Sequence, residues 1–293
     1  MFDETFYRIA LRYLPHYNNS FIKMLINKFE TATNIFTKAE NYIRQIKQKQ
    51  YNISIPFISN EIRSKVETEL VWMAKNEVSV CLYNDVHYPY RLKACCDSPY
   101  LFYYKGNSHF NPQRSVAIIG TRSASQYGVE MTKRIISELA AYKVTIVSGL
   151  AEGIDTAAHK YALLQQQPTW AVLGSGLSRI YPMSNDKLSV MIAKEGGALI
   201  SEYPHYFKPD RSHFPFRNRI IAGLSDATIV IETPKRGGSM ITAYIASSYN
   251  RDVFAVPGNI LTDNNNGCHQ LIRKNIAAIV TSGDDIADMM RWG

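Results

Sequence analysis

The segment Gly120-Thr121-Arg122 has the residue types of a phosphate-binding loop. It follows an apolar run and precedes a helical pattern, and the free amides at the start of a helix can hold an anion. Arg122 stands where a dinucleotide-binding loop has its second glycine, which blocks close approach to a pyrophosphate. Its guanidinium instead offers a fork of donors suited to one phosphate. We therefore expect an anion site here; the alternative is that Arg122 pairs with a carboxylate.

A basic and aromatic cluster lies further along the chain, just before the helical stretch that starts at Ile220. It comprises Arg211, Phe214, Phe216, Arg217, Asn218 and Arg219. Arginines beside aromatic rings can contact backbone phosphates while a base stacks on a ring. The cluster therefore favours a single-stranded nucleic acid as ligand. The alternative is that Phe214 and Phe216 belong to the core and that Arg217 and Arg219 brace the loops.

Three glycine-containing loops add candidate contacts. Ser148-Gly149 follows an apolar run and permits a tight turn before the next helix. Gly238-Ser239, with Thr242, lies in a glycine-rich turn where amides and hydroxyls form another anion site. Gly174 belongs to a Gly-Ser-Gly turn, which is a weak signal. We expect all three loops to reach one edge of a sheet.

Acid–base chemistry has little support in the sequence. Asp155 and His159 lie one helical turn apart, but Asp155 is interpreted as the N-cap of that helix rather than as a catalytic acid. The seven histidines form no metal-binding pattern, and no serine or cysteine stands in a nucleophile elbow. We therefore predict no catalytic residues, no metal and no cofactor.

The elements that must position these loops are short apolar runs alternating with helical patterns. Because the runs are rich in β-branched residues and lack polar alternation, they suit strands buried on both faces of a parallel sheet. The fold class predicted is α/β, a Rossmann-like doubly wound, mostly parallel sheet with a small N-terminal helical domain. Such sheets bind ligands at the carboxyl ends of their strands. The predicted strands are 115–119, 143–147, 169–173, 197–200, 227–231, 253–256 and 277–280.

Three segments are predicted along the chain. Residues 1–78 form a helical N-terminal domain, because apolar side chains recur at helical spacing and strand signals are absent. Residues 79–114 form a connecting extension whose aromatic end packs on the core. Residues 115–293 form the Rossmann-like domain that binds the ligand.

The bulk composition fits an intracellular binding protein. The 293 residues carry 33 Lys and Arg against 25 Asp and Glu, a net charge of +8. A polyanionic partner is consistent with this charge, as is a basic surface that only maintains solubility. The four cysteines contain no Cys-x-x-Cys pair, and neither a signal peptide nor a membrane span is evident. We expect a cytoplasmic protein without membrane contact.

A series of motifs resembles the DNA-processing protein A family, also called DprA or Smf. The resemblance covers about residues 80 to 285. The matching pieces are Ile119-Gly120-Thr121-Arg122, Ser148-Gly149-Leu150-Ala151 with Gly153-Ile154-Asp155, Tyr181-Pro182, Ser201-Glu202-Tyr203, Phe214-Pro215 with Arg217-Asn218-Arg219, Gly238-Ser239 with Thr242-Ala243, and Val256-Pro257-Gly258.

The resemblance implies a homodimeric recombination mediator that binds and protects single-stranded DNA. It also implies help in loading the RecA recombinase during natural transformation, without enzymatic turnover. By position, Arg122 and Arg211 are expected to contact the strand. Family members commonly have a lysine after the Tyr-Pro pair, whereas this chain has Met183, so either Arg179 or Lys187 is the expected substitute. The helical domain lacks the glycines of a helix-hairpin-helix and is assigned no DNA contact.

Two rival interpretations stay open at this stage. The first is a nucleotide-binding enzyme of the nucleoside-monophosphate phosphoribohydrolase type, which has a glutamate after its glycine-rich turn. The segment Gly237 to Ile245 has no glutamate, so the acid–base group is missing. The second is a protein-interaction scaffold without DNA binding, which Met183 favours.

Overall fold

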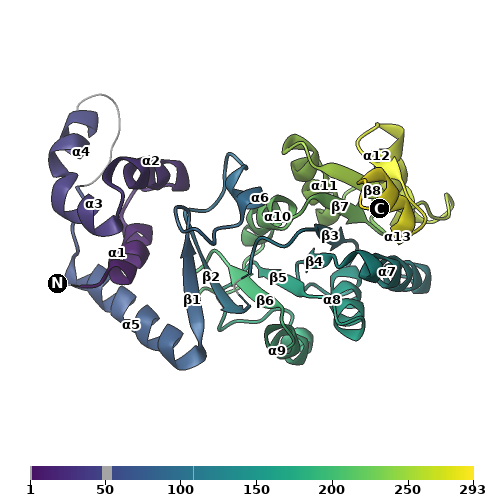
Figure 1. Cartoon of the computed structure of the whole chain (residues 1–293), viewed down its shortest axis with the longest axis horizontal. Helices are drawn as coiled ribbons and strands as arrows, with labels where there is room; N and C mark the ends of the chain where they lie inside the picture. The colour runs from purple at the N-terminus through teal and green to yellow at the C-terminus, as the bar shows by residue number, and fades with distance from the viewer. Residues whose placement is uncertain (1, 48–54, 108) are drawn as a thin grey trace.

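The computed structural model describes residues 2–47, 55–107 and 109–293, and its centre is one large β-sheet (Figure 1). In this described part the sheet has nine strands in the order β1-β2-β6-β5-β4-β3-β7-β8-β9. The strands are β1 Val78–Leu82, β2 Leu101–Gly106, β3 Ser115–Ile119, β4 Thr145–Ser148, β5 Thr169–Leu173, β6 Ala198–Ser201, β7 Ala227–Val230, β8 Asp252–Ala255 and β9 Ala278–Ile279.

The seven strands from β3 to β9 are parallel, which confirms the predicted fold class. The chain runs outward from β3 to β6, then returns to β3 and continues outward from β7 to β9. The loops that follow β3 and β7 therefore leave the sheet in opposite directions. Such a topological switch point opens a crevice at the carboxyl ends of the strands.

Helices cover both faces of the parallel sheet (Figure 1). Val116 and Ile118 of β3 share one core with α7 and α8, while Ala117 and Ile119 share another with α10 and α11. This alternation explains why the strand is apolar throughout. One face carries α7 Gln126–Leu139, α8 Ile154–Leu164, α9 Asp186–Lys194 and α13 Gly283–Met289, and the other carries α6 Tyr90–Lys93, α10 His213–Gly223, α11 Gly238–Ser248 and α12 Asn266–Arg273.

The N-terminal region is helical, as predicted, within the residues that the structure describes. Side-chain oxygens of Asp3, Asn18, Thr31 and Ser59 accept hydrogen bonds from first-turn amides, so each of four helices begins at a capping residue. The predicted helical stretch at 48–54 lies outside the described residues. The helices are α1 Glu4–Ala10, α2 Asn19–Phe29, α3 Ala32–Lys38, α4 Glu40–Lys47 and α5 Asn60–Asn76, with a 3₁₀ turn at Leu11–Tyr13.

Residues 79–114, predicted as a connecting extension packed on the core, also contain strand structure that local sequence patterns did not indicate. Strand β2 pairs antiparallel with β6, and β1 pairs antiparallel with β2, so this segment extends the sheet by two strands. Tyr100, Leu101 and Tyr103 are buried in the same core as the N-terminal helices. The segment thus joins the helical region to the sheet through shared packing.

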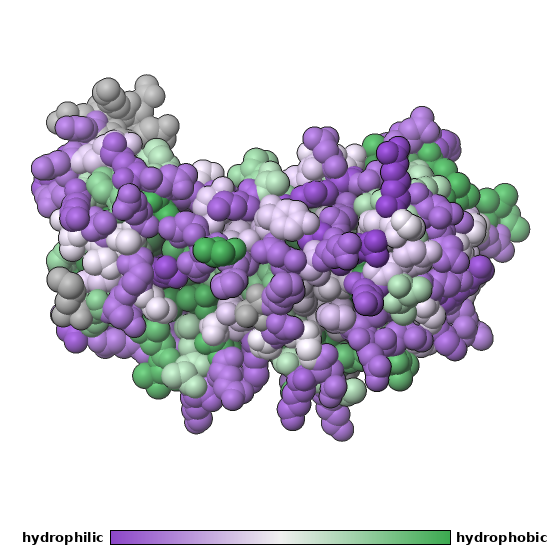
Figure 2. Space-filling view, viewed as in Figure 1, coloured by the Kyte–Doolittle hydropathy of each residue, from purple (hydrophilic) through white to green (hydrophobic). Residues whose placement is uncertain are grey.

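The surface is mostly polar on the face that Figure 2 shows, with hydrophobic side chains scattered both across this face and along its margins. In the part of the chain that the structure describes, we find no helix of the length and apolar character that crossing a membrane requires.

Candidate nucleic-acid interface

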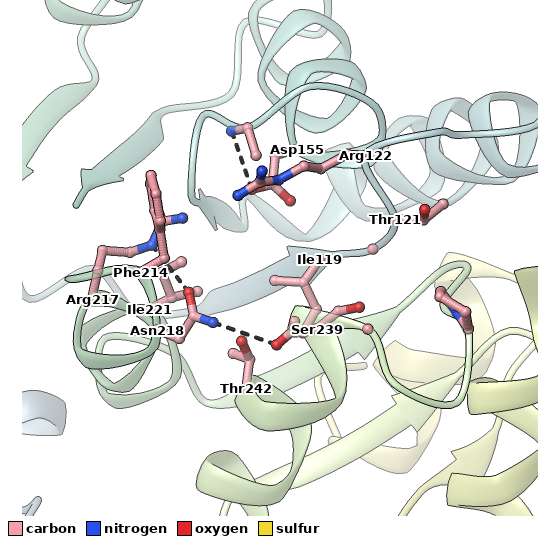
Figure 3. A pocket seen from close by; sticks show the side chains of 15 residues that line it. Ile119, Thr121, Arg122, Asp155, Phe214, Arg217, Asn218, Ile221, Ser239 and Thr242 are labelled. Atoms are coloured by element: carbon pink, nitrogen blue, oxygen red, sulfur yellow. Dashed lines mark hydrogen bonds between the residues drawn. The ribbon is translucent and has the colours of Figure 1, made fainter. Parts of the chain in front are cut away.

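A cavity of about 310 Å³ opens at the switch point between β3 and β7 (Figure 3). Its walls come from the loops after β3, β4 and β7 and from helices α10 and α11. Sequence positions more than a hundred residues apart therefore meet at one edge of the sheet. The predicted residues that line it are Gly120, Thr121, Arg122, Phe214, Arg217, Asn218, Gly238, Ser239 and Thr242.

Helix α10 explains how several of these side chains converge. The sequence was interpreted with a helix starting near Ile220, but α10 begins at His213. Phe214, Arg217 and Asn218 are therefore helical residues at positions i, i+3 and i+4, which share one face of a helix. Ile221 continues that face into the cavity.

Arg122 is the exposed cation of the cavity. Its guanidinium carbon lies 5.4 Å from the centroid of the Phe214 ring, within cation–π range. Among the described residues it belongs to no ion pair, so the alternative that Arg122 pairs with a carboxylate was wrong. A free guanidinium with an aromatic neighbour can bind a phosphate on one side and face a base on the other.

The start of α11 forms the opposite wall. Gly237 is its N-cap and has no side chain with which to cap the first amides. The first amides of a helix lack intrahelical acceptors, so those of Gly238 and Ser239 suit an anion. The Ser239 hydroxyl is already used, since it donates to Thr233 Oγ1 at 2.7 Å. The backbone, rather than this hydroxyl, is the anion-binding group here.

Arg217 has a different role from Arg122. It is buried, and its guanidinium donates to the carbonyl oxygens of Gly149 and Val172. Burial lowers the pKa of Arg217 to about 10, against the opposing attraction of Asp155. A Cβ at Gly149 would lie 2.6 Å from this guanidinium, so the loop approaches it closely only because residue 149 is glycine. This geometry matches the alternative in which Arg217 braces the loops.

Asp155 is not the N-cap of its helix, contrary to the sequence interpretation. Gly153, with φ of 77°, precedes the first helical residue, Ile154. The carboxylate of Asp155 instead accepts hydrogen bonds from the amides of Gly149 and Ala151, at 3.2 and 3.3 Å. Burial raises its pKa, and the Arg217 charge and these amides oppose the rise. Asp155 thus orders the loop after β4.

His159 lies inside the fold, away from the cavity lining. Because the Thr169 hydroxyl donates to the Ile146 carbonyl, it accepts from Nδ1 of His159 at 2.7 Å, which assigns the neutral Nδ1–H tautomer. Burial lowers the pKa of His159 to about 3. The pair of Asp155 and His159 therefore has no acid–base geometry at the cavity.

Six predicted residues lie outside the cavity lining, and one of them is Gly149, which packs against the Arg217 guanidinium. Ser148 is buried and donates to the Ile118 carbonyl. Arg219 is buried and forms an ion pair with Glu202. Gly174 underlies the ring of Phe214, since a Cβ there would lie 2.9 Å from that ring. Arg179 and Arg211 are exposed beyond the lining.

Tyr181 was quoted as part of a motif but not predicted as a site residue. Its ring centroid lies 5.9 Å from that of Phe214, and it lines a small recess beside the cavity with Arg122. The sequence signal that could have found it is its place beside a proline in the motif series, and the structure leaves its side chain 46% exposed. Met183, at the position of the family's usual lysine, is exposed and outside the lining.

The doubly wound sheet, with a cavity at its switch point, defines a Rossmann-like α/β protein, and the cavity offers groups that could hold a phosphate and stack a base. The chain belongs to the DNA recombination-mediator protein A family, which matches residues 79–291.

Individual relatives support this assignment. The DNA processing protein DprA of Streptococcus pneumoniae is 44% identical over 199 residues, which is 68% of this chain and 70% of that protein. Protein Smf of Escherichia coli is 36% identical over 248 residues, which is 85% of this chain but 64% of that protein's length.

Solved structures agree. DNA processing protein A of S. pneumoniae superposes with a TM-score of 0.70 at 36% identity, covering 93% of this chain and 98% of that one. The Helicobacter pylori protein has a TM-score of 0.66 at 29% identity, covering 73% and 96%, and its structure concerns a single-stranded DNA binding mode.

Proposed function

We propose that this chain binds single-stranded DNA in the switch-point cavity, protects it, and helps to load the RecA recombinase during transformation and recombination. The observation that carries the proposal is the meeting of Arg122, Phe214 and the free amides of α11 in one cavity. Family membership supports the role in recombination, and the single-stranded DNA binding mode described for the H. pylori protein supports the ligand.

In the proposed complex, Arg122 and the amides of Gly238 and Ser239 hold successive phosphates. A base stacks against the pair formed by the Phe214 ring and the Arg122 guanidinium. A single strand fits because its bases can turn away from one another, whereas a stiff duplex cannot enter a cavity of about 310 Å³. Arg217 acts indirectly, by holding the loop after β4.

The proposal of two further partners, a second copy of this chain and RecA, is supported by family membership and not by the geometry of the cavity. We propose a homodimer, because two cavities on one assembly would raise the effective concentration for a long strand. With DNA and RecA as partners, the protein works in the cytoplasm. Arg179 and Arg211 are exposed cations outside the lining, and we propose that they contact phosphates only as the strand leaves the cavity.

The proposed function includes no catalysis. A phosphoribohydrolase needs a carboxylate that can act on a glycosidic bond in the cavity. Asp155 is the carboxylate among the described lining residues, and two backbone amides already hold it. Glu232 is buried and accepts from the amide and hydroxyl of Ser125.

Fluorescence anisotropy with labelled single-stranded and duplex oligonucleotides tests the proposal. We expect preference for the single strand, and loss of affinity in Arg122→Ala. Equal affinity for duplex, or unchanged affinity in Arg122→Ala, would contradict the cavity as the site. Release of ribose phosphate from a nucleoside monophosphate would favour the enzyme instead.

A further inference from the structure

A second cavity, of about 600 Å³, lies where the N-terminal helical region meets the sheet domain. We call it the interdomain cavity. It opens between the segment around the 3₁₀ turn at Leu11–Tyr13, the start of α2, the loop after β6 and helix α10. The lining residues used below are Arg12, Tyr100, Tyr203, His213, Phe216 and Arg219.

Helix α10 is the wall that separates the two cavities. Phe214, Arg217 and Asn218 face the switch-point cavity, whereas His213 and Phe216 line the interdomain cavity. These two sets alternate along the first turns of one helix, so the cavities open on opposite sides of its N-terminal end. A flexible strand that leaves the first cavity needs only to cross this helix end to reach the second.

The interdomain cavity offers a platform of aromatic rings. His213 stacks on Tyr203, with ring centroids 4.4 Å apart and planes inclined by 25°. The Arg12 guanidinium lies over the other ring of this pair, 5.6 Å from the Tyr203 centroid. Phe216 also lines this cavity and is 63% exposed, so its ring is accessible to a ligand there. Flat, exposed and partly cationic surfaces of this kind bind unpaired bases.

Hydrogen-bonding capacity in the same cavity is unused. The Tyr100 side chain is only 2% exposed, and its hydroxyl has no hydrogen-bond partner among the described residues. Nδ1 of His213 is buried and likewise without a partner in the described chain. Buried polar atoms normally find partners, so these two atoms point to a ligand or ordered solvent in the cavity.

The charge in the cavity favours an anionic chain. The carboxylate of Glu202 is held by Arg219 and by the side-chain amide of Asn19, at 2.8 Å from the latter. Because the same carboxylate also attracts Arg12, two arginines face one carboxylate and a net positive charge remains among these three groups. Aromatic faces, unused donors and excess positive charge together suit a nucleotide better than an apolar peptide.

We propose that the interdomain cavity is a second single-stranded DNA subsite, which receives an unpaired base from the strand that occupies the switch-point cavity. The base stacks on Phe216 and the His213–Tyr203 pair, and its edge meets the Tyr100 hydroxyl. This inference rests on the proposed function, and it gives the N-terminal helical region a direct part in binding.

The test compares a short and a long oligothymidylate, about 5 and about 20 nucleotides, by fluorescence anisotropy. The short strand can fill only one cavity, and the long one can fill both. The variants are Phe216→Ala, the ring-preserving Phe216→Tyr, and the control Phe57→Ala, which removes a phenylalanine that is 72% exposed outside both cavities. We expect Phe216→Ala to bind the long strand about tenfold more weakly and the short strand normally. Phe216→Tyr and Phe57→Ala should bind both as the wild type does.

The outcomes separate the two proposals. If the wild type binds neither strand, the proposed function is wrong, and this inference is wrong as well because it rests on that function. If Phe216→Ala binds both strands as the wild type does, the second subsite is wrong and the proposed function stands. An equal loss for both strands also overturns the subsite, because Phe216 would then act through α10 on the first cavity. As a second readout, long strands of 5-iodouridine should crosslink to peptides containing Tyr203 or Phe216, and crosslinks elsewhere only would overturn the inference.

Discussion

The guanidinium carbon of Arg122 lies 5.4 Å from the centroid of the Phe214 ring, so a cation and an aromatic face share the mouth of one cavity. The two residues come from a loop after β3 and from α10, and the ring is supported from below by Gly174. This relationship underlies the proposed binding of a phosphate together with a base.

Arg122→Ala should weaken single-stranded DNA binding by about 1.5–3 kcal/mol, because it removes a charge-assisted phosphate contact. The slope of log K against log salt should also fall by about 0.7, the value for one phosphate contact. Anisotropy titrations over a range of salt concentrations measure both. Arg44→Ala is the matched control, since Arg44 is an exposed arginine on α4, remote from the cavity (Figure 1). The same slope in Arg122→Ala and wild type would argue against a phosphate contact.

Gly238→Ala should separate binding from stability. A Cβ at Gly238 meets nothing within 4 Å, so the protein can accept it, and alanine is a better helix former than glycine. The added methyl group would occupy space beside the amides that are proposed to hold a phosphate. We expect an unchanged or slightly higher melting temperature with about tenfold weaker binding of single-stranded DNA. Full binding affinity would show that the start of α11 does not contact the strand.

Arg217→Met should destabilise the fold, unlike Arg122→Ala. The change leaves the carbonyls of Gly149 and Val172 without their donor and Asp155 without its nearby positive charge. Leaving a buried carbonyl without its donor costs about 1–3 kcal/mol, which urea unfolding can measure. In the double variant with Asp155→Asn, the loss should be smaller than the sum of the single losses. If Arg217→Met were as stable as the wild type, Arg217 would not hold the loop after β4 in place.

His159 should make the protein less stable as the pH falls below about 6.5. Burial lowers its pKa in the folded protein to about 3 from the ordinary value of 6.5, so the folded state keeps it neutral. The unfolded chain takes up the proton first, and stability therefore falls by up to about 1.4 kcal/mol per pH unit between these values. Denaturant unfolding at pH 7, 6 and 5 should show a shallower decline in His159→Gln. An NMR titration midpoint near 6.5 for folded His159 would refute this.

The parallel part of the sheet could be predicted from the sequence because each strand is a short β-branched run with no polar alternation. The two antiparallel strands, β1 and β2, could not be predicted in this way. Strand β1, Val78–Leu82, is short and mixed, and β2 is an aromatic run bounded by turn residues. What makes β2 a strand is its pairing with β6, a partner far away in the sequence that local patterns do not identify.

The sequence predicted which loops form the site. It did not predict which of their side chains are exposed to a ligand and which are buried and hold the loops in place. Arg122 and Arg217 look alike in the sequence, yet one is free at the surface and the other is buried against two carbonyls. Asp155 was assigned a capping role because the start of α8 was placed too late. Gly153, with its positive φ, lets the helix begin at Ile154, and this moves Asp155 inside the first turn.

The pairing of β2 with β6 also has a consequence for the order in which a ribosome can complete this protein. Residues 101–106 can pair with β1 as soon as they emerge, but they gain β6, which joins them to the parallel sheet, only when residues 198–201 have emerged. At about 5–20 residues per second, that interval is on the order of 5–20 s. During synthesis, the N-terminal helices and the aromatic strand β2 therefore remain without part of their packing until β6 is made. We expect chaperones to bind the apolar surface that is exposed at this junction of the nascent chain.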